Sequence, residues 1–433
     1  MSNTLLKQII LFGFIFLLFV PLIQKEFPFY EEKPLKGVFT LTAKPDSIYK
    51  NWFSGEYQLK YEKYFNDSIG FRAFFIRLYN QIEFSLFKNV STQFTALGKD
   101  NVLYQNCYIE SYLGNDYIGE HKIISEVKKI EFVQNELLKR GKKLLYIIAP
   151  GKASIYPDNF PLSYDTICKK TSNYDTYIKY LKQYKIEYFD VRNYFLQIKQ
   201  ASKYPLFPKN GTHWSGYGVS LVADSLYKRL SALFNKDLAE IEFLTGREES
   251  INLDFTDNDM GKALNLFFEL SNWKMYYPKI KFHSKMKLKA LIIGDSFAQS
   301  FFGFGHYFYY IFSQDSKYFY YYETVFWPRI DDADLRNIES YNISDLVNEN
   351  ELILVILTDQ NLDKNTFGFF DDLYSLFKNG DSITHEETEK VIKNIKSNEK
   401  WFKAILRQAK ERKISVDEML RRNAIFTIKN RKK

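Results

Sequence analysis

Two short motifs carry the side chains best suited to chemistry. The first is Gly294-Asp295-Ser296-Phe297, which follows the apolar run Ala290 to Ile293 and precedes a helical stretch. A serine there would present its hydroxyl at the carboxyl edge of a sheet, near a helix N-terminus whose backbone N–H groups can stabilise an oxyanion. The alternative is that Asp295 and Ser296 form only an ordinary helix N-cap.

The second motif is the loop Phe207 to Ser215, which contains His213 and Trp214 and leads into a predicted helix. A serine hydroxyl is a weak nucleophile until a neighbouring base removes its proton, so a histidine in this place complements Ser296. The alternative is that His213 hydrogen-bonds only its own loop while Trp214 fills the core. We predict that His213 is the base.

Short apolar runs alternate with helical patterns through the middle of the chain and would position these motifs. The predicted strands are Leu144 to Ala149, Ile186 to Val191, Leu288 to Ile293 and Leu352 to Leu357. The predicted helices are Ser125 to Arg140, Ser172 to Lys185 and Ser215 to about Phe234. This alternation predicts a mostly parallel sheet with helices on both faces, which brings polar strand-end residues together where ligands bind.

The N-terminus carries the apolar, uncharged run Ile9 to Ile23, preceded by Lys7 and followed by Lys25. Its length approaches that of a bilayer span, and no small-residue cleavage site follows, so we predict an uncleaved signal anchor. The short N-terminus would lie inside and the bulk would be translocated. We therefore expect a single-pass protein of the inner or cytoplasmic membrane that faces the periplasm or cell exterior. The alternative is a buried helix of a soluble core.

Four regions are predicted along the chain. They are a cytoplasmic stub and transmembrane anchor over 1–25, a linker and helical region over 26–95, an α/β domain over 96–380, and a charged helical segment over 381–433. The second region contains a helical pattern from Trp52 to Phe87 with a break near 66–70. The last region is interpreted as a helical pair.

Composition excludes several classes of protein. The net charge of +8 over 433 residues is mild, and lysines are interspersed with acids, so no nucleic-acid partner is predicted. The five histidines lie in unrelated surroundings, so neither a metal nor another cofactor is predicted. Cys107 and Cys168 could form one disulfide or remain two buried thiols, and both interpretations stay open.

The serine and histidine motifs, together with several other short motifs, make the chain resemble a known family. It is similar to the SGNH-hydrolase-like proteins of polysaccharide O-acetylation, the AlgX/AlgJ group of alginate acetylation factors and their envelope relatives. The shared motifs are Trp52…Gly55-Glu56-Tyr57-Gln58, Phe71-Arg72…Ile76 to Gln81, Leu97 to Asp100, Pro150-Gly151-Lys152…Ile155-Tyr156-Pro157, Thr212 to Ser215 and Gly294 to Phe297. The resemblance implies a three-layer α/β/α fold and a Ser-His-Asp site that handles acetyl esters.

Carried over by position, Ser296 matches the family's nucleophile and His213 its base. The family's acid usually lies two residues before the histidine, where this chain has Gly211. This departure matters because the acid orients the histidine and stabilises the imidazolium. Asn210 could orient the imidazole without neutralising its charge. The carboxylates that could substitute from elsewhere in space are Asp259, Asp295 and Asp359.

Three further residues are candidates for the site. The Ser296 backbone N–H would hold the oxyanion, and Asn361, after the strand end, is the candidate for the second donor. Lys152 and Trp214 are candidates for the edge of the site, although a solvated lysine is the more ordinary interpretation of Lys152. The aromatic run Tyr318 to Tyr322 is interpreted as a strand rather than a groove lining.

The resemblance implies acyl transfer through a serine acyl-enzyme, with a cell-envelope or extracellular polysaccharide as acceptor and a membrane-bound O-acyltransferase as partner. Two alternatives remain open. The chain could be an acetylesterase of the same glycans, since both reactions share the acyl-enzyme and differ only in the acceptor. It could also be a catalytically impaired scaffold that presents polysaccharide to the acyltransferase, an interpretation that Gly211 favours.

Overall fold

The computed structural model describes residues 3–37, 40–45, 52–90, 92, 94–284, 286–326, 341–379, 385–411 and 416–431. Parts of the predicted linker over 26–95 and the first residues of the predicted segment over 381–433 therefore lie outside the described residues. The chain divides into two compact units. The first comprises Met1–Leu97 and Asp259–Ser271, and the second comprises Gly98–Asn258 and Asn272–Lys433.

The first unit is built mainly from helices. Its elements are α1 (Asn3–Glu26), α2 (Glu56–Ser68), α3 (Arg72–Phe87), β1 (Thr95–Leu97) and α10 (Asp259–Ala263). Residues 69–71 separate α2 from α3, so the break begins three residues later than the one predicted over 66–70. The backbone turns there at Gly70, where a Cβ atom would lie only 2.4 Å from the carbonyl oxygen of Pro21 in α1. Glycine is therefore required for the close approach of this turn to α1.

Helix α1 is long and apolar enough to cross a membrane. The candidate span is Thr4–Glu26, and its side chains are exposed except near its end. At that end, Gln24 is buried, accepts hydrogen bonds from the backbone N–H groups of Phe29 and Tyr30, and donates to the carbonyl of Tyr30. The apolar helix thus ends in a turn that is fixed within its own unit.

The second unit contains a six-stranded sheet. Its strands are β3 (Lys143–Ala149), β4 (Tyr188–Asp190), β7 (Ala290–Gly294), β8 (Lys317–Tyr320), β9 (Thr324–Val325) and β10 (Leu352–Thr358), in the order β4-β3-β10-β7-β8-β9. All neighbouring pairs are parallel except β8 and β9. The predicted mostly parallel sheet is confirmed.

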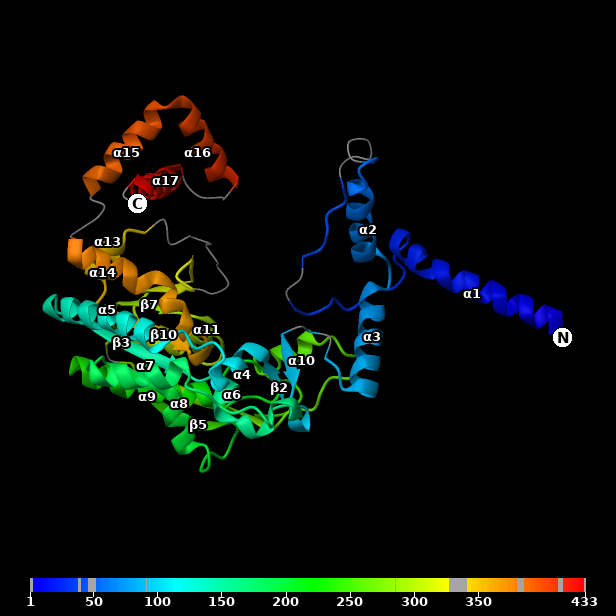
Figure 1. Cartoon of the computed structure of the whole chain (residues 1–433), viewed down its shortest axis with the longest axis horizontal. Coiled ribbons are helices and arrows are strands. Elements are labelled where there is room, and N and C mark those ends of the chain that lie inside the picture. The colour runs from blue at the N-terminus through cyan, green and yellow to red at the C-terminus, as the bar shows by residue number, and fades with distance from the viewer. Residues whose placement is uncertain are drawn as a thin grey trace. The chain divides into compact units, whose positions relative to one another are not determined.

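Helices cover both faces of this sheet (Figure 1). The main ones are α5 (Glu120–Lys139), α7 (Asn173–Gln183), α8 (Val191–Ile198), α9 (Gly216–Phe234), α11 (Ser296–Gly303) and α14 (Phe369–Asn379). Alternate strand residues such as Tyr146, Ile293 and Val355 form one buried cluster with α5, α7 and α14. On the other face, α8 and α11 contact β3 and β10. Because both faces are buried, these strands are apolar at nearly every position.

The remaining elements lie outside the sheet and its main helices. They are η1 (Lys99–Asn101), β2 (Leu103–Gln105), α4 (Asn106–Leu113), α6 (Lys152–Ile155), η2 (Pro157–Asn159), η3 (Leu162–Tyr164), β5 (Ala239–Glu249), β6 (Met275–Ser284), α12 (Tyr307–Ile311), α13 (Ile343–Glu349) and η5 (Asp359–Gly368). Strands β5 and β6 pair with each other in an antiparallel arrangement.

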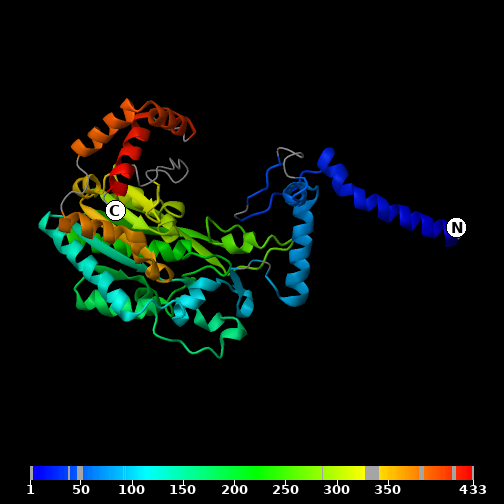
Figure 2. The same cartoon turned by 45° about the horizontal axis from the view of Figure 1, so that its top comes forward.

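The C-terminal segment forms three helices rather than the predicted pair. They are α15 (His385–Ser397), α16 (Glu399–Glu411) and α17 (Val416–Arg431), and they lie against one another (Figure 2). Their buried apolar side chains form a small core of their own. The extra break follows from Asn398, whose side-chain oxygen accepts from the N–H of Trp401 and so begins a new helix.

Two other expectations need correction. The strand predicted over Ile186 to Val191 is only three residues long, because the Asp190 side chain accepts from the N–H of Asn193, 2.9 Å away, and starts α8. Cys107 and Cys168 are both free and exposed, so neither the disulfide nor the buried-thiol interpretation holds.

Candidate active site

Ser296 is the first residue of α11, and only Asp295 separates it from the end of β7. Asp295 caps this helix, because its Oδ1 accepts a hydrogen bond of 3.0 Å from the N–H of Phe297. The serine hydroxyl therefore lies at the carboxyl edge of the sheet and at a helix N-terminus. Gly294 permits this tight passage from strand to helix, since a Cβ atom there would lie 3.0 Å from the carbonyl oxygen of Ile356.

His213 lies on the loop before α9. Ser215 caps that helix: its Oγ accepts from the N–H of Gly218 and donates to the carbonyl of Pro205. The neighbouring Trp214 is fully buried and packs against Phe297 and Phe301 of α11, with ring centroids 5.3 and 5.6 Å apart. The loop that carries the histidine is thereby packed on the helix that carries the serine.

This packing brings the two predicted residues together. His213 Nε2 and Ser296 Oγ are 2.9 Å apart, which is hydrogen-bonding distance. Both residues retain partial solvent exposure. Chemically, the pair can transfer the serine proton to the imidazole while the oxygen attacks an electrophile.

Asp295 and Asn361 join the ends of two central strands. Asp295 Oδ2 accepts hydrogen bonds of 2.8 Å from the N–H and the hydroxyl of Thr358, and a third of 2.8 Å from Asn361 Nδ2. Asn361 Nδ2 also lies 3.2 Å from the Thr358 hydroxyl oxygen. Both predicted residues therefore lie near Ser296, and their hydrogen bonds join the ends of β7 and β10 at the site.

Tyr321 is a site residue that the sequence did not reveal. It follows the last residue of β8 in a left-handed conformation, φ 51°, and its N–H donates to the carbonyl of Gly294, 2.9 Å away. Burial and the nearby Asp295 carboxylate raise the pKa of Tyr321, while side-chain hydrogen bonds with Ser296 and Asn361 lower it in part. The tyrosine hydroxyl therefore stays protonated beside the nucleophile. A left-handed backbone at a non-glycine residue is uncommon and is often found at functional sites.

The other predicted residues lie on neighbouring loops of the same unit. Lys152 is buried and donates to the carbonyls of Leu103 and Lys209 at 2.7 and 3.0 Å, so it is not a solvated lysine. Asn210 is buried and its Nδ2 donates to Asn272 Oδ1 at 2.8 Å. These bonds hold the histidine loop in place.

The Asp359 side chain is hydrogen-bonded to the segment that begins at Pro150, Gly151 and Lys152. Its Oδ1 accepts from the N–H of Gly151 at 2.9 Å, and its Oδ2 accepts from the Ser154 hydroxyl. Burial raises the pKa of this carboxyl, and Arg192 opposes that rise. Its contacts join strand β10 to the loop after β3.

Gly211, where the resemblance would place an acid, has no room for a side chain. A Cβ atom there would lie 2.4 Å from the carbonyl oxygen of Thr256, 2.6 Å from Pro208 Cγ and 3.1 Å from the carbonyl carbon of Asp257. Contacts below 3.0 Å to a backbone oxygen require the backbone to shift. The segment containing Thr256 and Asp257 therefore occupies the space beside position 211.

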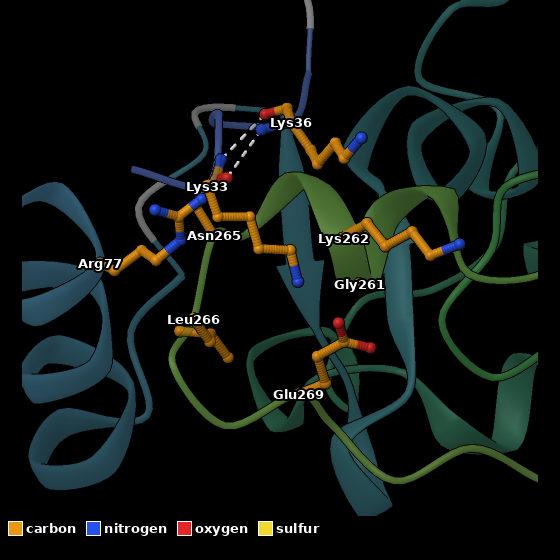
Figure 3. Close-up of a pocket in the computed structure, with 8 residues that line it drawn as sticks. All are labelled: Lys33, Lys36, Arg77, Gly261, Lys262, Asn265, Leu266 and Glu269. Atoms are coloured by element: carbon orange, nitrogen blue, oxygen red, sulfur yellow. Dashed lines mark hydrogen bonds between the residues drawn. The ribbon is translucent and has the colours of Figure 1, made fainter. Parts of the chain in front are cut away.

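A separate pocket of about 90 Å³ lies within the first unit and is lined by residues of that unit (Figure 3). Its walls carry the basic side chains Lys33, Lys36, Arg77 and Lys262 and the acidic Glu269. Asn265 joins its own segment to the one that contains Lys36. Its side chain accepts a hydrogen bond from the N–H of Lys36 and donates one to the carbonyl of Lys36, each at 2.8 Å. Among the described residues, no group of histidine, cysteine or acidic side chains is arranged to bind a metal ion.

The fold and the strand-end serine define an SGNH-hydrolase-like α/β protein. The sequence model of the family described as "SGNH hydrolase-like domain, acetyltransferase AlgX" matches residues 96–312, which is half of the chain. The chain belongs to this family. A comparison with curated proteins found no match.

Several solved structures are similar to this chain. The O-acetyltransferase domain of Pseudomonas putida AlgJ has a TM-score of 0.43 and 18% identity, over 66% of this chain and 98% of that one. Pseudomonas aeruginosa AlgX has a TM-score of 0.41 and 12% identity, over 64% and 70% of the two chains. Bacillus cereus PatB1 with a sulfonyl adduct has a TM-score of 0.43 and 11% identity, over 64% and 99%.

Proposed function

We propose that this chain is a membrane-anchored O-acetyltransferase that modifies a cell-envelope or extracellular polysaccharide through an acyl-enzyme on Ser296. The observation that carries the proposal is the 2.9 Å contact between His213 Nε2 and Ser296 Oγ at the carboxyl edge of the sheet. The family description as an acetyltransferase supports the choice of acyl group. The apolar helix Thr4–Glu26 supports the anchor.

The first half-reaction loads the serine. The Ser296 proton passes to His213 Nε2 as Oγ bonds to the acetyl carbonyl carbon of the donor. The donor's ester bond then breaks, and the leaving oxygen takes the proton from His213. The products are the free donor alcohol and an acetyl ester on Ser296.

The second half-reaction unloads it. A sugar hydroxyl gives its proton to His213 and attacks the acetyl carbon, and the Ser296 oxygen leaves and regains that proton. No oxidant or reductant is needed, because an ester is exchanged for an ester. If water replaces the sugar, the same steps make the chain an esterase.

Two donors would stabilise the oxyanion in both halves. One is the backbone N–H of Ser296 at the start of α11, where the helix dipole adds to its effect. The other is the hydroxyl of Tyr321, which interacts with the Ser296 side chain. We assign this role to Tyr321 rather than to Asn361, because the Asn361 amide already donates to Asp295 and Thr358.

Outside the site, we propose that the bulk of the chain lies on the periplasmic or outer side of the membrane. There it would receive acetyl groups made available by a membrane-bound O-acyltransferase partner. This partner is tested by purifying the full chain in detergent and asking whether a membrane-bound O-acyltransferase encoded by a neighbouring gene is purified with it.

The proposal is tested by covalent labelling. The folded chain should react with a fluorophosphonate, and the adduct should map to Ser296 by peptide mass spectrometry. Ser296→Ala should abolish labelling and acetyl transfer to polysaccharide while keeping the melting temperature of the parent. Acetate release without transfer would favour the esterase, and a folded, unlabelled parent would favour a scaffold and overturn the catalytic proposal.

A further inference from the structure

A buried aspartate packs against both ends of the turn that carries His213. Asp257 is fully buried and belongs to the segment that follows β5. Its carbonyl carbon lies beside Gly211, two residues before the histidine, and its Oδ2 accepts from the N–H of Gly216, 3.4 Å away and three residues after the histidine. The aspartate therefore spans the base of the His213 turn.

Asp257 is held as an acceptor in this position. The Tyr277 hydroxyl on β6 donates to its Oδ2 at 2.8 Å and itself accepts from the N–H of Asp254 at 3.0 Å. Burial and the charge of Asp257 raise the pKa of Tyr277 above its usual value, so the phenol stays a donor. Arg247, whose guanidinium lies over the Tyr277 ring, forms an ion pair with Asp254.

The other carboxylates near the site have their oxygens engaged elsewhere. Asp295 accepts from Phe297, Thr358 and Asn361 at the strand ends. Asp359 accepts from the loop after β3. These hydrogen bonds direct both carboxylates away from the histidine turn, whereas Asp257 contacts it at Gly211 and at Gly216.

We propose that Asp257 is the positioning residue for His213 and supplies, from a separate segment, the carboxylate that Gly211 lacks. The inference rests on the proposed function, in which His213 carries a proton during each half-reaction. A carboxylate beside the base stabilises the imidazolium and favours the tautomer whose Nε2 accepts the serine proton. The segment containing Thr256 and Asp257 leaves no room for an acidic side chain at position 211, and in this proposal its own Asp257 takes the role of that acid.

Asp257→Asn tests the inference because it keeps the shape and removes the charge. The rate of fluorophosphonate labelling of Ser296 should fall by about 10²-fold or more. The acid limb of the pH–rate profile should also move to lower pH, because the protonated imidazole loses an opposite charge. Asp257→Glu, which retains the charge, should lower the rate without moving that limb.

Two controls separate charge from folding. Tyr277→Phe keeps the carboxylate and should leave the acid limb in place, with a loss of about fivefold at most. Asp254→Asn removes a carboxylate from the same segment and should change neither rate nor limb. A loss in Asp257→Asn that is equal at every pH would assign Asp257 a structural role only and overturn the inference, as would an unchanged rate.

A second readout does not require catalysis. Nuclear magnetic resonance of histidine labelled at Cε1 follows the charge of each of the five rings with pH, and His213→Gln identifies the His213 signal. In Asp257→Asn the His213 titration curve should move to lower pH. If the parent is not labelled at Ser296 but this movement is seen, the proposed function fails while the coupling of Asp257 to His213 stands. An unmoved curve overturns the coupling.

Discussion

At the scale of single residues, a substitution of Tyr321 tests how the site stabilises the negative charge of the oxyanion. The hydroxyl interacts with Ser296 and Asn361, and the left-handed backbone directs it there. Tyr321→Phe removes one hydrogen-bond donor and little volume. We expect the rate constant for acetyl release from an acetyl ester to fall by about 10²- to 10³-fold, because one oxyanion donor contributes that much in a comparable site.

Tyr322→Phe is the matched control for this prediction. Tyr322 has the same left-handed backbone, φ 56°, but its hydroxyl donates to Asp372 at 2.7 Å. Its loss should leave the rate constant unchanged and should lower the melting temperature slightly. A Tyr321→Phe variant that turns over like the parent would exclude the hydroxyl as an oxyanion donor.

The sequence predicted these residues unequally. Ser296 was accessible to prediction because a buried strand, a helix start and the family motif coincide within a few residues. Tyr321 was not, because its run of aromatics is typical of a strand and only the backbone reversal after Tyr320 directs it to the site. Asp257 was missed because its place depends on packing between segments about 40 residues apart in the chain.

At the scale of elements, two helices on one face of the sheet are joined through a buried carboxyl. Glu126 of α5 accepts from the Tyr177 hydroxyl of α7, and burial raises the pKa of Glu126. An acid whose pKa is raised on folding favours the folded state at low pH, and this contribution is lost as the pH rises through the folded-state value. Glu126→Gln keeps an acceptor without the charge.

The melting temperature of Glu126→Gln, relative to that of the parent, should therefore rise between about pH 4 and pH 8. Glu120 of the same helix is the control with the opposite sign. Its hydrogen bonds with Lys179 and Tyr180 lower its pKa, so its contribution is present at neutral pH and lost on acidification. Glu120→Gln should thus lose melting temperature relative to the parent as the pH rises. If the melting temperatures of both variants, relative to that of the parent, change in the same direction with pH, the opposite pKa shifts assigned to Glu126 and Glu120 are wrong.

Elements were predicted well where one local pattern sets them and poorly where a cap intervenes. The runs at β3 and β10 are long, apolar and buried on both faces, so their pattern was sufficient. Helix α5 ends as predicted at Gly141, whose φ is 70° and beyond which the N–H of Lys142 bonds to the carbonyl of Leu137. By contrast, Asp190 and Asn398 start helices within segments whose apolar pattern continues through them.

At the scale of the whole molecule, the chain carries an apolar helix in its first unit and the α/β fold in its second. The candidate span Thr4–Glu26 has 23 residues, or about 34 Å of helix, which is enough to cross the hydrocarbon core. Its last turn is part of the first unit, since Pro21 accepts from the N–H of Gly70 at 3.2 Å and Gln24 binds the chain after the helix. A deletion that tests the anchor should therefore spare this turn.

A chain that begins at Val20 removes most of the apolar helix and keeps Pro21 and Gln24. We expect the full chain to stay in the membrane pellet after carbonate extraction and the shortened chain to move to the soluble fraction. Fluorophosphonate labelling of Ser296 in detergent should proceed at the same rate in both, because α1 contributes no residue to the proposed chemistry. If the shortened chain remains in the pellet while labelling normally, another part of the molecule holds it at the membrane and the anchor assignment is wrong.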